Sequence, residues 1–387
     1  MSPPRILFVT HTAALGGAEL YLRDVATHLR DHCAVALFNT GPLAQELIDR
    51  DIPVHLLSSP PGLHTVRKTS GVAAGLRALP GLARLTWTLS RLVAEYDLLY
   101  ANSQKALIVG ALAARLADRP VVWNLHDLLT ADHFSPFARR LATTWATYGA
   151  NLVVCNSDAT EQAFRNSGGR APTATVYNGF DPTPFDAVSS ETAHALRTSL
   201  GLGDAPTVGV FSRLAAWKGQ HVLLDTLSAL PGVHALLVGD ALFGTDDAYA
   251  ARLRRQASDL GIADRVHFLG FRDDVPRLMH AVDVVVHTSV AAEPFGRVIV
   301  EGMLAERPVV ATRAGGALEI ITDDVDGRLV PPGDVPALTT ALHHLLDHPQ
   351  QARRLARTGR ARARRRFSIS SAAEAVSALS KRVVSSS

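Results

Sequence analysis

Short apolar runs alternate with amphipathic segments along the whole chain. Each run is three to five residues long in most cases, and the segments between them repeat apolar residues at helical spacing. This alternation predicts an α/β fold in which parallel strands are joined by helical crossovers. The expected strands are residues 6–9, 34–38, 54–57, 98–100, 121–124, 152–155 and 175–176 in the first half, and 208–211, 235–238, 266–268, 284–287, 309–311 and 328–330 in the second.

The two halves meet in a stretch that interrupts regular structure. Gly179, Pro182 and Pro184 fall there, and a short helix is expected just beyond them. A chain of 387 residues is long enough for two domains. We therefore expect an N-terminal domain of residues 1–185 and a C-terminal domain of residues 186–368.

Two glutamates surround a tight turn after the apolar run 282–287. Glu293 stands before Pro294, Phe295 and Gly296, and Glu301 lies in the helix that follows. A strand, a turn and a helix place this turn at the carboxyl edge of a sheet, where open α/β folds bind ligands. The helix N-terminus favours a phosphate, and the carboxylates accept hydrogen bonds from diols. Two acidic residues that flank a helix for structural reasons are the competing interpretation.

A second strand-to-helix turn carries two cations. Arg213 and Lys218 follow the strand 208–211 and precede another helical segment. Such a pair can neutralise a diphosphate leaving group without a metal ion. Each cation alone would be an ordinary surface charge, but together the two turns predict one site for a diphosphate sugar.

These motifs resemble those of the retaining glycosyltransferases of family 4. The Arg/Lys pair combined with the two glutamates is specific to that family and its close relatives, and the matching elements span nearly the whole chain. They are Gly16-Gly17, His126-Asp127, Arg213, Lys218, the segment 293–301 and Gly315-Gly316.

The resemblance implies the GT-B fold, in which two Rossmann-like, doubly wound domains face each other across a cleft, with the last helix (369–387) packing back on the first domain. It implies a metal-independent retaining hexosyltransferase. Such an enzyme moves a hexosyl or N-acetylhexosaminyl group from a UDP- or GDP-sugar to a hydroxyl of a small molecule or glycan, forming an α-glycoside. No cofactor is expected beyond this donor substrate.

The resemblance also implies roles for single residues. Arg213 and Lys218 would hold the diphosphate, and Glu301 the ribose. Glu293, with the backbone of Phe295 and Gly296, would hold the donor sugar.

The first domain would contribute Gly16 and Gly17, which would line the donor phosphates and the acceptor, and His126 near the reacting carbon. The residues themselves argue against a nicotinamide dinucleotide fold, because the loop after the first strand has no G-x-G-x-x-G. For His126, a loop histidine on the surface is the competing interpretation.

The sequence also bears on disulfides, on the cellular compartment and on metal sites. The two cysteines, Cys33 and Cys155, indicate buried thiols rather than a disulfide framework. No signal-peptide pattern or membrane-spanning run is visible in the sequence, so we expect a cytoplasmic protein. No His/Cys cluster has zinc-ligand spacing, and Asp324-Val325-Asp326 has the character of a surface turn, so no metal site is expected.

Two basic stretches stand out. Residues 352–366 hold eight arginines without base-stacking aromatic residues, which indicates a solvated helix face rather than nucleic-acid binding. Residues 52–94 contain no acidic residue but five cations: Arg67, Lys68, Arg77, Arg84 and Arg91.

Within the second stretch, Leu82, Leu85, Leu89, Leu92 and Val93 follow helical spacing. We expect these leucines to pack on the sheet. A weak contact with a membrane surface, as in a peripheral enzyme with a lipid-linked acceptor, stays open. A nucleotide-sugar epimerase and a non-catalytic nucleotide-sugar binder also stay open, although all four charged residues of the expected donor site are present.

Overall fold

The computed structural model describes residues 3–57, 72–241 and 247–386. The chain forms two compact units, one of Met1–Phe180 with Ile369–Ser387 and one of Asp181–Ser368. The boundary after Phe180 lies five residues before the domain boundary at residue 185 that the sequence predicted. The reason is local, because helix α7 (Thr183–Asp186) is tied to the second unit: the Phe185 carbonyl lies 3.1 Å from His280 Nε2, and Asp186 pairs with Arg360 at 2.7 Å.

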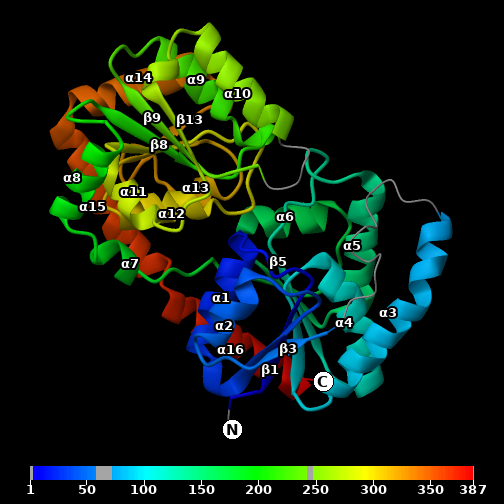
Figure 1. The fold of residues 1–387 in the computed structure, drawn as a ribbon. Helices are drawn as coiled ribbons and strands as arrows, with labels where there is room; N and C mark the ends of the chain where they lie inside the picture. Colours follow the sequence, from blue (N-terminus) through cyan, green and yellow to red (C-terminus); the bar gives the residue numbers. More distant parts are fainter. Residues whose placement is uncertain (1–2, 58–71, 242–246, 387) are drawn as a thin grey trace. The chain divides into compact units, whose positions relative to one another are not determined.

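The described part of unit 1 contains a seven-stranded parallel sheet in the order β3-β2-β1-β4-β5-β6-β7 (Figure 1). Every strand expected in this half is present, with its ends shifted by no more than about two residues. The strands are β1 (Ile6–Thr10), β2 (Cys33–Leu37), β3 (Val54–Leu56), β4 (Leu98–Ala101), β5 (Val121–Leu125), β6 (Leu152–Cys155) and β7 (Thr173–Thr175).

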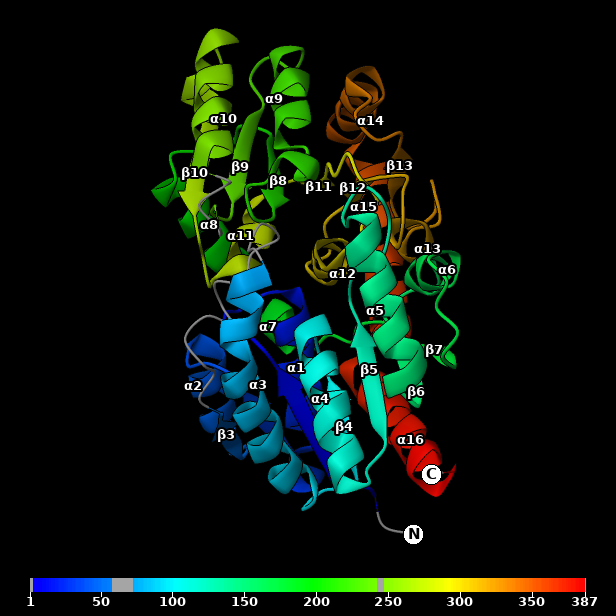
Figure 2. The same cartoon turned by 90° about the vertical axis from the view of Figure 1, so that its right-hand side faces the viewer.

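Helices cover both faces of this sheet. Alternate residues of β1 supply the two cores: Ile6 and Phe8 pack with α1, α2 and α16, while Leu7 and Val9 pack with α3, α4 and α5. The last helix of the chain, α16, thus completes the core of unit 1 (Figure 2). The helices are α1 (Gly17–His28), α2 (Pro42–Ile48), α3 (Val72–Val93), α4 (Gln104–Ala117), α5 (Pro136–Gly149), α6 (Asp158–Asn166) and α16 (Ile369–Ser386).

Unit 2 contains a six-stranded parallel sheet in the order β10-β9-β8-β11-β12-β13 within the described residues. Its strands also match the expected runs. They are β8 (Thr207–Phe211), β9 (His234–Val238), β10 (Val266–Gly270), β11 (Val284–His287), β12 (Val309–Thr312) and β13 (Arg328–Val330). Its helices are α7, α8 (Ser190–Ser199), α9 (Gln220–Ser228), α10 (Asp247–Asp259), α11 (Val275–Ala281), α12 (Arg297–Leu304), α13 (Ala317–Ile320), α14 (Val335–Asp347) and α15 (Pro349–Arg366).

The strand order reverses at one point in each sheet. In unit 1 the reversal lies between β1 and β4, and in unit 2 between β8 and β11. Ligands of open α/β sheets bind outside the carboxyl ends of the strands at such a point. The loops after these four strands are therefore the places to look for a site.

The structure also bears on two predictions from the sequence, one for the cysteines and one for the basic helix α15. Cys33 and Cys155 are both buried and free, as expected. The basic helix α15 is not simply a solvated face, because several of its arginines have partners: Arg360 pairs with Glu306 and Asp186, Arg362 lies 3.4 Å from Asp326, and Arg366 donates to the Glu319 carbonyl. Within the described residues, no helix combines the length and apolar character needed to cross a bilayer.

Candidate functional site

In unit 2, the loop after β8 is fastened to the loop after β11. The Thr288 hydroxyl donates to the Lys218 carbonyl at 2.8 Å, and the Val290 N–H donates to the Trp217 carbonyl at 2.8 Å. Gly219 has a φ of +70°, and a Cβ there would lie 2.0 Å from the Thr288 carbonyl oxygen. Only glycine permits this approach, so the sequence itself draws the two loops together at the switch point.

Glu293 is the centre of the resulting cluster. It is 7% exposed, and its Oε1 lies 2.5 Å from Lys218 Nζ, 2.5 Å from Ser289 Oγ and 2.9 Å from His287 Nε2. Burial alone would raise the pKa of this carboxyl, but Lys218 and His287 outweigh burial and hold the pKa well below its usual range. The structure therefore shows a buried carboxylate that stays charged, in contact with the Lys218 ammonium.

The two predicted cations share one aromatic ring. The Arg213 guanidinium lies 5.6 Å from the centroid of the Trp217 ring, and Lys218 Nζ lies 4.3 Å from it. Cations are attracted to the negative face of an indole. Gln220 also donates to the Arg213 carbonyl at 2.9 Å, which fixes the loop. Arg213, Lys218 and Glu293 are thus brought together, as the two-turn interpretation required.

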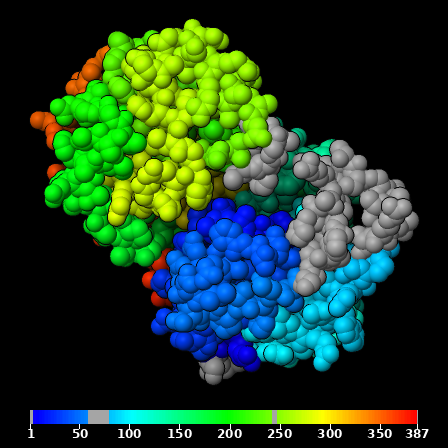
Figure 3. All heavy atoms as spheres, viewed as in Figure 1, coloured from blue at the N-terminus to red at the C-terminus, as the bar shows by residue number. Residues whose placement is uncertain are grey.

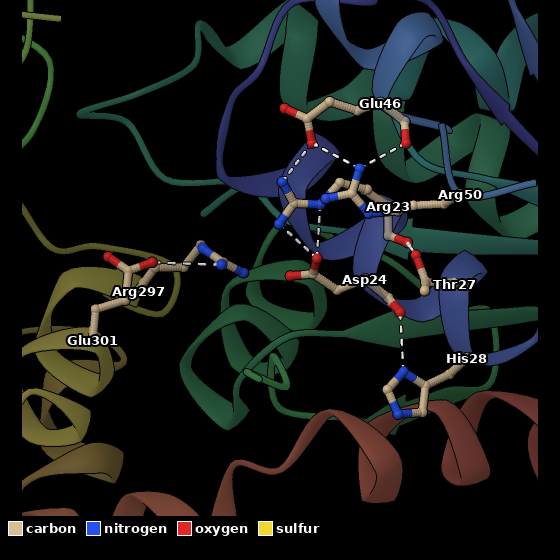
Figure 4. Close-up of polar contacts among 8 residues, drawn as sticks. All are labelled: Arg23, Asp24, Thr27, His28, Glu46, Arg50, Arg297 and Glu301. Carbon is tan, nitrogen blue, oxygen red and sulfur yellow. Dashed lines mark hydrogen bonds and ion pairs between the residues drawn. The ribbon is translucent and has the colours of Figure 1, made fainter. Parts of the chain in front are cut away.

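The helix after this turn carries Glu301. Its carboxylate lies 3.4 Å from Arg297, one turn earlier in α12 (Figure 4). Gly296, at φ +100°, precedes the helix. The Phe295 side chain is buried and stacks edge-on against Phe367 at 5.6 Å, so its ring is a packing element and only its backbone is available to a ligand.

Gly315 and Gly316 support the same turn from β12. The Gly316 N–H donates to the Glu293 carbonyl at 3.0 Å, and a Cβ on Gly316 would lie 2.5 Å from Phe295 Cα. At Gly315, with φ +59°, a Cβ would lie 2.2 Å from the Glu293 carbonyl oxygen. These glycines serve to bring two backbones together around Glu293.

In unit 1, Gly16 and Gly17 form the end of the loop after β1 and the start of α1. Glu19 follows at the third helical position and is 8% exposed. Burial raises the pKa of Glu19 to about 7; the backbone N–H groups of Glu19 and Gly16 oppose the shift, and nearby Asp127 adds to it. The carboxyl of Glu19 caps the glycine loop in the manner of a capping box.

His126 lies in a group of amide side chains after β5. Its Nε2 is 2.6 Å from Asn124 Nδ2, its Nδ1 is 3.4 Å from Asn156 Nδ2, and the Tyr21 ring lies edge-on at 5.2 Å. Asn124 donates to Asn102 at 2.8 Å.

Asn102 connects this group to the start of α1, since its amide donates to the Ala18 carbonyl at 3.1 Å. Ser103 caps α4 and also lies 2.9 Å from His11 Nδ1. Amide side chains thus connect the loops after β4 and β5 to the start of α1, so His126 and the glycine loop belong to one group.

The predicted residues therefore form two groups, one in each unit. Sequence reasoning missed His287, Ser289 and Trp217 in unit 2 and Glu19 in unit 1. A signal existed for Glu19, because it stands three residues after a helix cap. His287 also had one, since a polar residue ending a buried strand at the switch point merits attention.

Comparison with known proteins gives matches over both units. Residues 15–183 match the model of Glycosyltransferase Family 4, and residues 194–362 match that of Glycosyl transferases group 1. The crystal structure of HepE from Anabaena, solved with UDP and glucose, is 42% identical and has a TM-score of 0.89, covering 97% of this chain and 99% of HepE.

Two curated relatives extend the likeness. A GDP-mannose-dependent α-(1-6)-phosphatidylinositol monomannoside mannosyltransferase of Mycolicibacterium smegmatis is 31% identical over 70% of this chain and 73% of its own length. The lipopolysaccharide core biosynthesis glycosyltransferase LpsE of Rhizobium meliloti is 35% identical over 40% of this chain, and the match spans less than half (44%) of LpsE.

Proposed function

The chain belongs to the glycosyltransferases of family 4 and group 1, and from that premise we propose that it is a metal-independent, retaining hexosyltransferase using a UDP-hexose. The observation that carries the proposal is the buried Lys218–Glu293 pair at the switch point of unit 2, beside Arg213 on the face of Trp217. The choice of UDP is supported by HepE, which was crystallised with UDP-glucose. A GDP-sugar is the competing donor, given the mannosyltransferase relative.

Arg213 and Lys218 are proposed to bind the diphosphate. An ammonium group carries three N–H donors, so the contact of Lys218 with Glu293 leaves donors for phosphate oxygens. The charge on the diphosphate grows as the glycosidic bond breaks, and fixed cations stabilise this charge most in the transition state.

Glu293 is proposed to orient the donor sugar. Its contacts with Lys218, Ser289 and His287 converge on Oε1, so Oε2 is the oxygen assigned to a sugar hydroxyl. Glu301, in the helix that directly follows the turn, is assigned to the ribose diol. This division gives each carboxylate one part of the donor.

In unit 1, His126 is assigned to the donor sugar near the reacting carbon, and Gly16 with Gly17 to the donor phosphates and the acceptor. The proposed reaction is a front-side substitution. The acceptor oxygen forms a bond to the anomeric carbon as the carbon–oxygen bond to the diphosphate breaks. The bonding electrons leave with the diphosphate, and one of its oxygens takes the acceptor proton. The product is an α-glycoside.

The test starts with binding. Thermal shift with UDP, GDP, ADP and dTDP should select UDP. Release of UDP from UDP-glucose, with and without a panel of hydroxyl acceptors and in excess EDTA, then measures transfer. Acceptor-dependent release in EDTA supports the proposal. Loss of activity in EDTA contradicts metal independence, and binding without any release favours a non-catalytic binder. Formation of a free epimeric sugar nucleotide favours an epimerase.

Two variants test the roles of the cations. Lys218→Ala should lower kcat by a larger factor than it weakens donor binding, and Arg213→Lys should not restore full activity because lysine lacks the bidentate fork. Arg255→Ala, an exposed arginine on α10, is the matched control and should leave both parameters unchanged. Native kcat in both site variants at saturating donor would refute the cation assignment.

A further inference from the structure

Three neighbouring helices of unit 1 carry positive charge only. Helices α3, α4 and α5 lie side by side over one face of the sheet (Figure 2). None of the three contains an aspartate or glutamate. The cations of these helices whose side chains the structure describes are Arg84, Arg91, Lys105, Arg115, Arg139 and Arg140. We call the exposed side of these helices the α3–α5 surface. Arg67 and Lys68, from the same acid-free stretch of sequence, lie outside the described residues.

The buried apolar residues of α3 do not belong to this surface. Leu85, Leu89 and Val93 are buried in the core between α3 and the sheet, as the sequence favoured, so they cannot touch a membrane. The opposite side of the helix has its own pattern: Arg84, Trp87 and Arg91 follow one another at spacings of three and four and share one face. Trp87 is 62% exposed. Figure 3 shows part of the outer surface of α3, although it labels no single residue.

The neighbouring helices continue this pattern. On α4, Leu112 and Leu116 are exposed beside Arg115, and on α5, Phe137 and Tyr148 are exposed, the latter at 86%. With Leu79, six of the thirteen large hydrophobic residues that are exposed in the described chain lie on these three helices. Single exposed apolar residues are ordinary, but this concentration on one layer is not.

The cations here differ from those of α15. Among the described residues, no acidic side chain pairs with Arg84, Arg91, Arg115 or Arg140. On α15, by contrast, Arg360, Arg362 and Arg364 pair with Asp186, Glu306 or Asp326. The cations of the α3–α5 surface keep their full attraction for an external anion.

We propose that the α3–α5 surface docks on an anionic lipid bilayer. Lysine and arginine near such a surface are attracted to its headgroups, while tryptophan and tyrosine settle at the interface. The leucines distinguish this partner from a nucleic acid, since aliphatic side chains gain by entering the acyl boundary but find no counterpart on a phosphate backbone. The arginine stems lie along the apolar layer while their heads meet phosphate.

The experiment uses the full chain and vesicles, with no donor or acceptor, so its outcome is separate from that of the proposed transfer reaction. Co-sedimentation should show binding to vesicles of equal phosphatidylcholine and phosphatidylglycerol, little binding to pure phosphatidylcholine, and weakening as salt is added. The tryptophan emission should shift to shorter wavelength on binding. The Trp87→Ala variant should lose most of that shift.

The double variant Arg84→Gln/Arg91→Gln should bind the anionic vesicles about 30-fold more weakly. Arg353→Gln/Arg354→Gln is the matched control, because it removes the same charge from an exposed face of α15. It should change binding by no more than about twofold. Melting curves of all variants should coincide with that of the native chain, since each residue is exposed.

Four results would overturn the proposal. The first is equal binding to neutral and anionic vesicles, and the second is absence of binding to either. The third is an equal loss of binding in the α15 control. Retention on duplex DNA as strong as on vesicles and unchanged by Trp87→Ala would also overturn it, by showing that only charge is recognised.

Discussion

The two units share the same order over six strands and the same switch point, although unit 1 has a seventh strand, yet they place opposite kinds of chemistry there. In unit 2 the loops after β8 and β11 bring Lys218 and His287 onto a buried Glu293 that stays charged. In unit 1 the loops after β1, β4 and β5 bring together amides, His126 and Glu19, whose pKa is raised to about 7. The topology therefore fixes where a ligand can bind, and the side chains decide which ligand it is.

This difference matches the two kinds of substrate a transferase handles. A diphosphate keeps its charge throughout the reaction and grows more negative as it leaves, so fixed charges suit it. A hydroxyl acceptor is neutral, and amide or imidazole groups suit it. The proposed assignment of the diphosphate to Arg213 and Lys218 in unit 2, and of neutral sugar hydroxyls to His126 in unit 1, agrees with this contrast.

Removing the charge of Lys218 is the strongest test of this difference between the two units. Lys218→Met leaves the Glu293 carboxylate buried without its main partner, and breaking a buried pair costs about 3–5 kcal/mol. We expect the free energy of unfolding, measured in urea, to fall by that order, and turnover to fall with it. The second change Glu293→Gln removes the isolated charge.

The double variant Lys218→Met/Glu293→Gln should therefore regain most of the lost stability while staying inactive. This result would separate the contribution of the pair to stability from its contribution to turnover. If the double variant is no more stable than Lys218→Met, the pair is not the source of the loss. If it regains turnover as well, the pair has no part in the reaction.

In unit 1 the corresponding change is Glu19→Gln. Burial raises the pKa of Glu19 from 4.5 to about 7, so the folded chain holds a proton that the unfolded chain releases between these values. The stability from this carboxyl is full at acidic pH and is lost as the pH rises through about 7. At pH 8 the buried carboxyl must carry a charge, which destabilises the fold. Glu19→Gln removes this charge and should stabilise the protein at pH 8 by about 2–3 kcal/mol, while it should change little at pH 5.

The measurement is urea unfolding of both proteins from acidic to mildly alkaline pH. Taking the difference between the two proteins cancels the contribution of the groups that both share. A difference that stays constant with pH would show that Glu19 does not titrate in the fold, and the contrast between the units would then rest on His126 and the amides alone.

Glu301 tests whether donor binding divides as proposed. Glu301→Ala should weaken UDP binding about 10- to 150-fold, because the ribose loses a charged hydrogen-bond partner worth about 1.5–3 kcal/mol. Glu293→Gln should leave UDP affinity almost unchanged while turnover falls, since Glu293 is assigned to the sugar. Calorimetry with UDP measures both. Equal losses in the two variants would place both carboxylates in the nucleotide subsite.

The sequence was sufficient for the strands because each is a short apolar run closed by turn residues. It also allowed Arg213, Lys218 and Glu293 to be placed at the edge of the sheet, because each follows such a run, while their roles in binding a donor stay predictions. It could not reveal that Gly219 lets one loop touch another, since that contact joins residues about seventy positions apart. For the same reason the sequence did not reveal the acidic partners of α15, since Asp186 and Glu306 are distant from that helix in the sequence.

His287 is the most informative of the residues missed, and it gives the smallest expected effect. It ends β11, is 5% exposed, and contacts Glu293 through Nε2 and the Thr312 hydroxyl through Nδ1 at 3.3 Å. It therefore connects the carboxylate of the site to the next strand of the sheet, β12.

His287→Leu removes one of the groups that hold the pKa of Glu293 low, so that pKa should rise. A depressed carboxyl pKa stabilises the fold above the unfolded-state value, and this stability is lost as pH falls through the folded value. Acid unfolding of His287→Leu should therefore begin at a higher pH than in the native chain. Turnover should fall by about tenfold, the equivalent of one hydrogen bond to a charged group. His287→Gln keeps an N–H donor and should recover part of both effects. A merely space-filling histidine would give equal results for the two variants, and the positioning role would then be withdrawn.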